Sequence, residues 1–469
     1  MGREYGTRRG LGTERVEPLD LQDVKLRKMA SHLHLAYLRI GGTEADQLIY
    51  RVKKKHAGRS SEEAPDGSYY LDRQSWKGVE QFCQDIGAEP FMTLNAGPER
   101  RKEDDTWRGK NARSLIRYSI KRGKCLPIWE LGNEVNAYPF FHGKGISPAR
   151  YADAIGKLGK IIVEEGGCRV AGPALVVWPI VGEVLPFLRR FLKGLSSRGH
   201  NLDILTWHFY PQQSFRCPVA TRRARPYTLL NPRNLDGLGR TARRVCRLSR
   251  RYLPAAELWL GETGHAQCGG EPGISDRFIS SLWWLDTLGQ MALWGHKQVV
   301  RQALIGGDYG LINFKTGEPN PDYWATLLWN SLMGEMVYRV KPRGSQKLRV
   351  YLHSHPRRPD VLSLLVINLD RRREGVLQLP STLSRPEEQF TVTAESLFGS
   401  EVYLNGKVLS LDDKLRLPDL SGLPVRPVVQ AEEKKGKKAK EGGQGDVRVA
   451  PGSYGFFVVS STGLSRGTE

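Results

Sequence analysis

Short apolar runs alternate with longer amphipathic stretches from about residue 20 to residue 335. Apolar runs that alternate with helical patterns are typical of βα units built around a parallel sheet. The pattern predicts strands at 36–42, 90–97, 126–134, 169–175, 202–210, 257–264 and 298–307. Among the amphipathic stretches, it predicts helices at 20–33, 75–87, 147–166 and 275–295. Polar residues stand at the carboxyl end of nearly every predicted strand, where (β/α)₈ barrels hold their active sites.

The predicted strands number seven, one fewer than a (β/α)₈ barrel requires. The shortfall lies at the front, because residues 1–35 offer a helix but no convincing strand before it. We therefore predict an α/β fold: a (β/α)₈ TIM barrel over 20–335 that lacks its first strand. After residue 335 the pattern changes to short alternating runs separated by turns, which predicts an all-β sandwich domain over 336–469. Within it, 430–446 is a low-complexity basic stretch that we expect to form a disordered loop.

Composition narrows the class of partner. The chain has 469 residues, of which 39% are apolar, and no apolar run approaches the length of a membrane span, so we expect no transmembrane segment. The 71 Lys and Arg residues outnumber the 50 Asp and Glu residues, which gives a formal charge of +21 and favours an anionic partner. A nucleic-acid partner would be supported by charge alone, without a recognition motif, so we do not expect one.

The six cysteines form no Cys-x-x-Cys pair and show no metal-ligand spacing with histidine. They are too sparse for a disulfide framework, and the redox compartment stays open. We expect no metal and no cofactor. The first twenty residues lack an apolar core, so we expect no signal peptide in the chain as written.

Two predicted strands end on glutamates. The strand at 126–134 ends in Asn133–Glu134, and the strand at 257–264 delivers Glu262. A retaining glycosidase needs two carboxyl groups roughly 5–5.5 Å apart, one as acid/base and one as nucleophile. Strand ends that face each other across a barrel mouth can provide this spacing, and Asn133 could hydrogen-bond the sugar 2-OH. Glu130 should point the same way but lie deeper, in a structural role. The alternative is that Glu134 and Glu262 are helix caps or ion-paired residues at the rim. Such roles would not require both glutamates to stand at strand ends.

The strings WELGNE, TWHFY, WLGETG and LRIGGTEAD, with paired C-terminal strings such as YGFFVV, resemble the heparanase and β-glucuronidase family, glycoside hydrolase family 79 of clan A. The resemblance runs from about residue 25 to residue 460. It implies that Glu134 is the acid/base and Glu262 the nucleophile, with Tyr210 positioning the nucleophile.

Further candidate substrate contacts follow from the same resemblance. Gln302 and Tyr309 match residues that line the uronic-acid subsite. Gly269 and Gly270 match a loop whose N–H groups can hold the uronate carboxylate, and Thr43 matches another sugar contact. The glycines could instead form a plain turn, and the tyrosines could be packing residues.

The resemblance implies a retaining endo-β-glucuronidase that cleaves heparan sulfate or a similar acidic polysaccharide as a monomeric single chain, secreted, in the extracellular matrix or in the lysosome. An exo-acting β-glucuronidase and a non-catalytic heparan-sulfate-binding paralogue remain alternatives. Basic residues near the rim, at 142–145 and 216–225, favour a polyanionic substrate. The family's first strand, with its sugar-contacting aspartate, has no counterpart here. The long linker of animal proheparanases is also absent, so maturation by its removal looks unnecessary.

Overall fold

The computed structural model describes residues 3–4, 14–15, 19–53, 69–124, 127–177, 184–218, 220–425 and 446–461. Nearly all of the predicted loop at 430–446 lies outside these ranges. The chain divides into two compact units, which consist of residues 1–224, 237–270 and 294–310, and of residues 225–236, 271–293 and 311–469. No helix in the described ranges is both long enough and apolar enough to cross a membrane. The proposed domain boundary after residue 335 stays a prediction.

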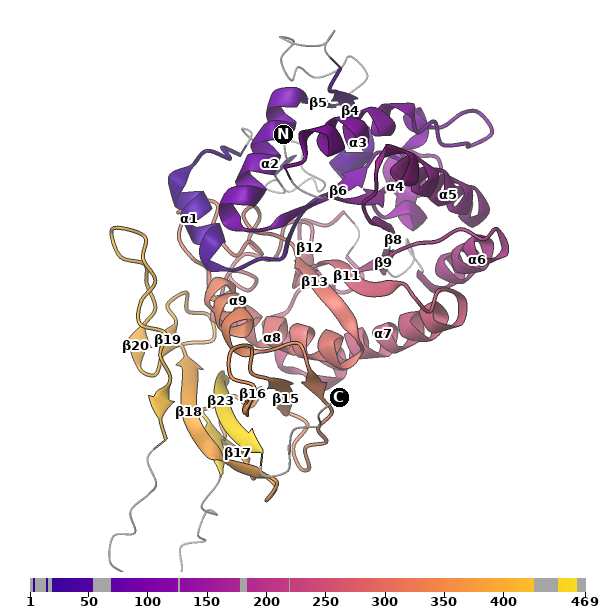
Figure 1. The fold of residues 1–469 in the computed structure, drawn as a ribbon. Helices are drawn as coiled ribbons and strands as arrows, with labels where there is room; N and C mark the ends of the chain where they lie inside the picture. Colours follow the sequence, from indigo (N-terminus) through magenta and orange to yellow (C-terminus); the bar gives the residue numbers. More distant parts are fainter. Residues whose placement is uncertain are drawn as a thin grey trace, which may run out of the picture. The chain divides into compact units, whose positions relative to one another are not determined.

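A seven-stranded parallel sheet forms the centre of the first unit, in the order β13-β11-β9-β8-β7-β6-β3 (Figure 1). Its strands are β3 (Tyr37–Ile40), β6 (Glu89–Leu94), β7 (Ile128–Leu131), β8 (Val170–Val177), β9 (Ile204–Phe209), β11 (Glu257–Thr263) and β13 (His296–Arg301). Each overlaps one predicted strand, although β13 begins two residues before the predicted range 298–307 and ends six residues short of its end. In the described part of the chain, β3 and β13 are edge strands that do not pair with each other. The expected fold, a barrel that lacks one strand, is confirmed.

An apolar layer lies inside this sheet, near the amino-terminal ends of most of its strands. One residue from each strand contributes to it: Phe91, Ile128, Ala171, Ile204 and Trp259, with Tyr37 and Val300 packed against them. Successive side chains of a strand point to opposite faces, so these residues also identify which positions face the interior. The layer therefore sets the register from which the polar residues nearer the carboxyl ends are positioned.

The helices of the first unit lie around the outside of the sheet (Figure 1). Three predicted helices are observed as α1 (Val24–His32), α2 (Arg73–Ile86) and α5 (Pro148–Glu165). The others are α3 (Lys110–Arg122), α4 (Tyr138–His142), α6 (Val184–Ser197) and α7 (Pro232–Tyr252), the last of which begins in the second unit. Ser147 caps α5 by accepting a hydrogen bond from the N–H of Arg150.

Two short parallel pairs stand in loops of the first unit. They are β4 (Leu48–Arg51) with β5 (Tyr69–Asp72), and β10 (Gln212–Gln213) with β12 (Ala266–Gln267). A third pair, β1 (Arg3–Glu4) with β2 (Glu14–Arg15), is antiparallel. The β4 pair follows β3, and the β10–β12 pair joins the loops that follow β9 and β11. Both parallel pairs therefore order loops at the carboxyl ends of the sheet.

The second unit contains α8 (Phe278–Leu293), α9 (Pro321–Leu332) and an antiparallel sheet. The strands of that sheet are β14 (Val337–Tyr338), β15 (Leu348–Ser354), β16 (Val361–Asn368), β18 (Leu383–Thr393), β19 (Tyr403–Leu404), β20 (Lys407–Val408), β21 (Leu423–Pro424) and β23 (Ser453–Ser461). The pair β17 (Gly375–Leu377) and β22 (Val447–Val449) packs on it through Val447 and Val449. The expected C-terminal β architecture is confirmed.

Candidate active site

A polar layer lies directly above the apolar layer. Residues two positions further along four strands share the inward face: Arg39, Thr93, Glu130 and Thr206. Glu130 is fully buried and accepts hydrogen bonds from Arg39 Nε at 2.9 Å, Thr93 Oγ1 at 2.8 Å and Thr206 Oγ1 at 2.7 Å. Because both carboxylate oxygens are satisfied within the protein, Glu130 anchors the strand ends and leaves the chemistry to residues nearer the mouth.

Arg39 joins the two strand ends that carry the candidate catalytic residues. Its Nη1 donates to Glu262 Oε2 at 2.7 Å, and its Nη2 donates to Asn133 Oδ1 and Glu130 Oε2, both at 2.8 Å. Burial alone would lower the pKa of Arg39, but the charges of Glu130 and Glu262 raise it, so the guanidinium stays charged. Sequence reasoning missed Arg39. The signal was a basic residue placed at an inward position of an otherwise apolar strand.

A tight turn at the end of β7 delivers Glu134 to the interior. Gly132 has φ +70°, and a Cβ built there would lie 2.4 Å from the hydroxyl oxygen of Tyr138, so only glycine fits. Glu134 itself adopts the left-handed conformation at φ 53° and ψ 46°, and its N–H donates to the carbonyl of Ala174 at 2.9 Å. Glu134 Oε1 lies 3.1 Å from Nδ1 of His208, a buried residue of β9. A strained backbone held in this way is common at functional sites.

Glu262 reaches the interior because β11 is irregular. Trp259 faces inward, so strict alternation would turn Glu262 outward. The pairing of β11 with β9 slips between Leu260 and Glu262, and a slip of this kind re-aims the following side chain. Tyr210 Oη then donates to Glu262 Oε1 at 2.7 Å, and the positioning role inferred for Tyr210 stays a prediction.

The two glutamates meet beside His208. One oxygen of each carboxylate and one ring nitrogen of His208 all lie within 4.8 Å of one another. Burial raises the pKa of Glu134, and this effect outweighs its hydrogen bond with His208. Burial would also raise the pKa of Glu262, but His208, the charge of Arg39 and the hydrogen bond from Tyr210 together lower it. The environments move the two pKa values apart, so Glu134 holds its proton to a higher pH than Glu262 does.

This cluster has the donor types of a small metal site, with two carboxylates and one imidazole. Both oxygens of Glu262 are already engaged, however, one by the hydroxyl of Tyr210 and the other by the guanidinium of Arg39. The positive charge of Arg39 occupies the place where a cation would neutralise Glu262. The arrangement therefore fits acid–base and nucleophilic chemistry better than metal ligation.

Asn133 is held from both sides. Its N–H donates to Asp46 Oδ2 at 2.9 Å, and its side-chain oxygen accepts from Arg39 Nη2. Asp46 Oδ1 accepts in turn from the N–H of Ala96 at 2.9 Å, so Asp46 ties the ends of β6 and β7 together. Asp46 was not predicted from the sequence, where it is one of two acidic residues in the polar string GGTEAD.

Asp46 should make stability depend on pH. Burial raises its pKa to about 7, against the opposing hydrogen bonds from Ala96 and Asn133. Folded Asp46 therefore keeps its proton at pH values where unfolded Asp46 has already lost it. Its contribution to stability is fully present below the unfolded pKa of 3.8 and is lost as the pH rises through the folded pKa of about 7. We expect the free energy of unfolding to fall by up to about 4 kcal/mol over this range because of Asp46.

Urea unfolding of wild type and Asp46→Asn between about pH 4 and pH 7.5 measures this effect. The variant cannot ionise, so its unfolding free energy should vary less steeply with pH, whatever its stability at a single pH. Asp413→Asn is the matched control, because this exposed carboxylate forms no ion pair among the described residues, and it should change the slope less than Asp46→Asn does. Equal slopes for wild type and Asp46→Asn would contradict the assignment.

Three further candidate residues gather around the backbone that follows Glu262. A Cβ on Gly264 would lie 3.0 Å from the ring of Tyr210, 3.2 Å from the carbonyl oxygen of Gln302 and 3.2 Å from the ring of Tyr309. Gln302 Nε2 also donates to Tyr309 Oη at 3.3 Å. The structure thus brings Tyr210, Gln302 and Tyr309 together with Glu262. Thr43 begins a short 3₁₀ helix after β3, and no hydrogen bond in the described part joins it to these residues.

Gly269 and Gly270 both have positive φ values, +86° and +83°. Their carbonyls are held: Gly269 accepts from the N–H of Asp308 at 2.6 Å, and Gly270 accepts from Arg216 Nη1 at 3.2 Å. Arg216 also forms an ion pair with Asp308 at 2.6 Å. A loop whose carbonyls are fixed in this way can present its N–H groups to an anion.

A disulfide between Cys217 and Cys268 ties the loop after β9 to this glycine loop. Sequence spacing left the cysteines unassigned, because the two residues stand 51 positions apart and meet only when neighbouring strands pair. Cys83, Cys168 and Cys246 form no disulfide within the described ranges.

The family profile described as "Glycosyl hydrolase family 79, N-terminal domain" matches residues 9–289. The chain belongs to this family. It is a glycoside hydrolase, and the expected family is confirmed. Heparanase of Bos taurus is 30% identical over 493 residues, which cover 93% of this chain and 84% of the relative. Baicalin-beta-D-glucuronidase of Scutellaria baicalensis is 29% identical over 438 residues, covering 86% and 79% respectively.

Solved structures share the fold of this family 79 chain at much lower identity. The α-L-arabinofuranosidase of Thermotoga maritima superposes with a TM-score of 0.63 at 15% identity, covering 95% of this chain and 92% of that one. Similarity at this level supports the barrel architecture alone. Substrate and mechanism have to be argued from the side chains of this chain.

Proposed function

We propose that this family 79 chain is a retaining β-glucuronidase in which Glu134 is the acid/base and Glu262 the nucleophile. The observation that carries the proposal is the pairing of these two buried carboxylates. One oxygen of Glu134 lies within 4.8 Å of one oxygen of Glu262, and the pKa values of the two groups shift in opposite directions. Retaining glycosidases hold their two carboxyl groups roughly 5–5.5 Å apart, because the nucleophile must reach the anomeric carbon directly. A protonated acid beside an ionised nucleophile is the starting state that such a reaction needs.

In the first step, a Glu262 oxygen attacks the anomeric carbon while Glu134 gives its proton to the departing glycosidic oxygen. The carbon–oxygen bond of the glycoside breaks, and a glycosyl ester on Glu262 forms. In the second step, water attacks the same carbon, Glu134 takes the proton of the water, and the ester bond breaks to restore Glu262. Arg39 and Tyr210 keep Glu262 ionised and oriented before each attack.

The substrate we propose is a glucuronide within heparan sulfate or a similar acidic polysaccharide, cleaved in the interior of the chain. The N–H groups of Gly269 and Gly270 are suited to the uronate carboxylate. The formal charge of +21 favours a polyanion, and the similarity to heparanase agrees with this. Arg216 is an exception among the basic residues expected at the rim, because Asp308 already neutralises it. Such a substrate would be met in the extracellular matrix or the lysosome.

Exo-acting removal of single glucuronates is the second candidate. The similarity to the baicalin-β-D-glucuronidase, whose name denotes a small glucuronide, favours it. Both activities use the same two glutamates. They differ in whether the loops around the mouth leave room for a chain on both sides of the cleaved bond.

Two measurements on the purified full chain test the proposal. Proton NMR of the first product released from a β-glucuronide should show the β-anomer before it mutarotates; an initial α-anomer would exclude the retaining mechanism. Size analysis of a long heparan sulfate chain during digestion should show a rapid fall in average length. Release of monosaccharide with little change in length would support the exo alternative. Absence of cleavage for both substrates would support the non-catalytic paralogue.

A further inference from the structure

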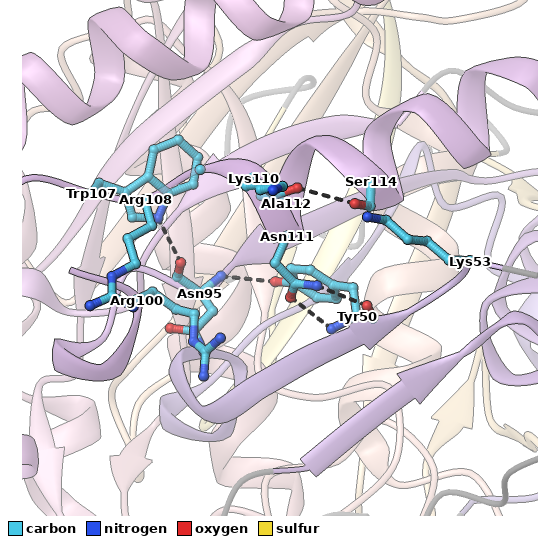
Figure 2. A pocket seen from close by; sticks show the side chains of 11 residues that line it. Tyr50, Lys53, Asn95, Arg100, Trp107, Arg108, Lys110, Asn111, Ala112 and Ser114 are labelled. Carbon is cyan, nitrogen blue, oxygen red and sulfur yellow. Dashed lines mark hydrogen bonds between the residues drawn. The ribbon is translucent and has the colours of Figure 1, made fainter. Parts of the chain in front are cut away.

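A cavity of about 280 Å³ lies in the first unit, beside the loop that connects β6 to α3 (Figure 2). Four basic residues line it: Lys53, Arg100, Arg108 and Lys110. Lys53 follows β4, Arg100 and Arg108 belong to the β6–α3 loop, and Lys110 begins α3. The cavity therefore collects positive charge from two stretches of the first unit that are distant in the sequence, Lys53 and residues 100–110.

These four cations have no counterion within the part of the chain that the structure describes. Other basic residues nearby do have partners: Arg101 and Lys144 both pair with Asp105. The Nε of Arg100 is buried and has no hydrogen-bond partner among the described residues. Lys53, Arg108 and Lys110 are exposed and Arg100 is half-buried, so all four can turn toward a ligand in the cavity. Their summed positive field makes the cavity suited to a compact oxyanion.

The walls of this basic pocket are built rigidly. Trp107 Nε1 donates to the carbonyl of Asn95 at 3.0 Å, and the side chain of Asn111 exchanges two hydrogen bonds with the backbone of Tyr50, at 2.8 and 2.9 Å (Figure 2). Gly109, at φ +62°, makes the sharp turn into α3, where a Cβ would lie 3.1 Å from the ring of Trp107. Fixed walls lower the entropic cost of binding, because little has to be ordered when the ligand arrives.

The first turn of α3 adds to the positive field. Gly109 is its N-cap residue, no side chain caps the helix, and no acidic residue occupies its first turn. The N-terminus of a helix carries partial positive charge on its free N–H groups. This contribution reinforces the charges of Arg108 and Lys110 beside it; the pocket itself depends on the four side chains.

The basic pocket and the catalytic pair lie at the same end of the sheet. Asn95 lines the pocket directly after β6, and β7, which ends in Glu134, is the neighbouring strand. Asp46 links the two, because it accepts hydrogen bonds from Ala96 on one side and Asn133 on the other. A polymer that crosses the mouth can therefore extend from the catalytic pair toward the pocket, whereas a single glucuronide engages the catalytic pair alone.

We propose that the basic pocket binds a sulfate ester of the acidic polysaccharide, on a sugar removed from the cleaved bond. This inference rests on the function proposed above. Arginine suits sulfate because its planar fork can donate two parallel hydrogen bonds, and lysine adds point charge. The pocket then contributes affinity for sulfated polymer that small glucuronides do not obtain.

The test compares two double variants with the same change in charge. Arg108→Gln/Lys110→Gln removes two pocket charges whose side chains form no hydrogen bond or ion pair in the described structure. Lys160→Gln/Lys193→Gln removes two exposed charges on α5 and α6 and is the matched control. Lys53→Gln/Lys110→Gln serves as a second pocket variant if the first does not fold.

Binding of a heparin decasaccharide is measured by calorimetry in the Glu262→Gln background, at several sodium chloride concentrations. We expect the pocket variant to bind about tenfold more weakly and to lower the salt slope of log Kd by about 2, one for each charge removed. The control should change both quantities far less. Removal of sulfate from the probe should abolish the difference between pocket variant and control.

Equal losses in the pocket variant and the control would overturn the proposal. A second result would also overturn it: the pocket variant loses binding of inorganic sulfate but keeps the wild-type affinity for the decasaccharide. The pocket would then be a site for free anions and not for the polymer. The proposed function is judged separately, by hydrolysis of a β-glucuronide by the wild-type chain. If hydrolysis fails while sulfate-dependent binding persists, the pocket stands and the catalytic proposal does not.

Discussion

Glu262→Gln should lower kcat for a β-glucuronide by about 10⁴-fold to 10⁶-fold, the range seen when an enzyme's nucleophile or its activating partner is removed. The amide keeps the shape of the carboxylate and can still accept from Tyr210 Oη. It carries no charge and cannot form the glycosyl ester. The measurement is single-turnover and steady-state hydrolysis of a chromogenic glucuronide, with thermal unfolding to confirm that the variant is folded.

Azide, added as an external nucleophile, distinguishes the roles of the two glutamates by the anomer that each alanine variant produces. Glu262→Ala leaves room for azide to attack the anomeric carbon, and the product should be the α-glucuronosyl azide. Glu134→Ala still forms the ester on Glu262, which azide then displaces to give the β-azide. Glu99→Gln, at an exposed position, is the control and should keep wild-type rates. Wild-type rates in Glu262→Gln, or the same anomer from both alanine variants, would show that the roles are assigned wrongly.

The parts of the fold that depend on local pattern could be predicted. Each of the seven strands was located from a run of apolar residues, since a buried parallel strand is apolar on both faces. The two glutamates were expected to meet because the carboxyl ends of all strands in such a sheet lie on one side. The structure places them within 4.8 Å, although 128 residues separate Glu134 from Glu262 in the chain.

Features that depend on pairing between distant strands could not be predicted. Alternation counted from Trp259 places Glu262 outside, and only the slip of β11 against β9 turns it inward. A slip of one residue leaves no signature in the sequence of β11 itself. Arg39 is the same kind of case: a buried arginine is tolerated only where carboxylates from other strands meet it, and those partners are 91 and 223 residues away.

The net charge of the chain could be predicted from the sequence, but the positions of its unpaired basic side chains could not. The excess of Lys and Arg indicated an anionic partner, yet the sequence could not distinguish a neutralised arginine from an unpaired one. Arg216 lies at the rim and is paired with Asp308. Arg100, by contrast, lines a cavity without a counterion among the described residues. Pairing depends on loops that meet in space, so the side chains available to a substrate are known only from the structure.

Arg39→Lys should lower kcat/KM by about 10²-fold to 10³-fold, the cost of removing one oriented donor from a catalytic site. It should also move the acidic limb of the pH–rate profile to higher pH. Catalysis needs Glu262 ionised, and Arg39 helps to hold the pKa of Glu262 below its ordinary value. A lysine keeps the charge, but one ammonium cannot bridge Glu130, Asn133 and Glu262 as the guanidinium does. The pKa of Glu262 therefore rises toward its ordinary value, and more acid-side activity is lost.

The pH profile of kcat/KM distinguishes this positioning role from a merely structural one. Thr93→Val is the control, because it removes one hydrogen bond from Glu130 while leaving the contact between Arg39 and Glu262 in place. It should lower thermal stability without moving the acidic limb. The basic limb reports the acid/base Glu134 and should shift less than the acidic limb in Arg39→Lys, since burial is the main cause of the raised pKa of Glu134. An Arg39→Lys profile that superposes on that of wild type would show that Arg39 supports the fold and does not tune the nucleophile.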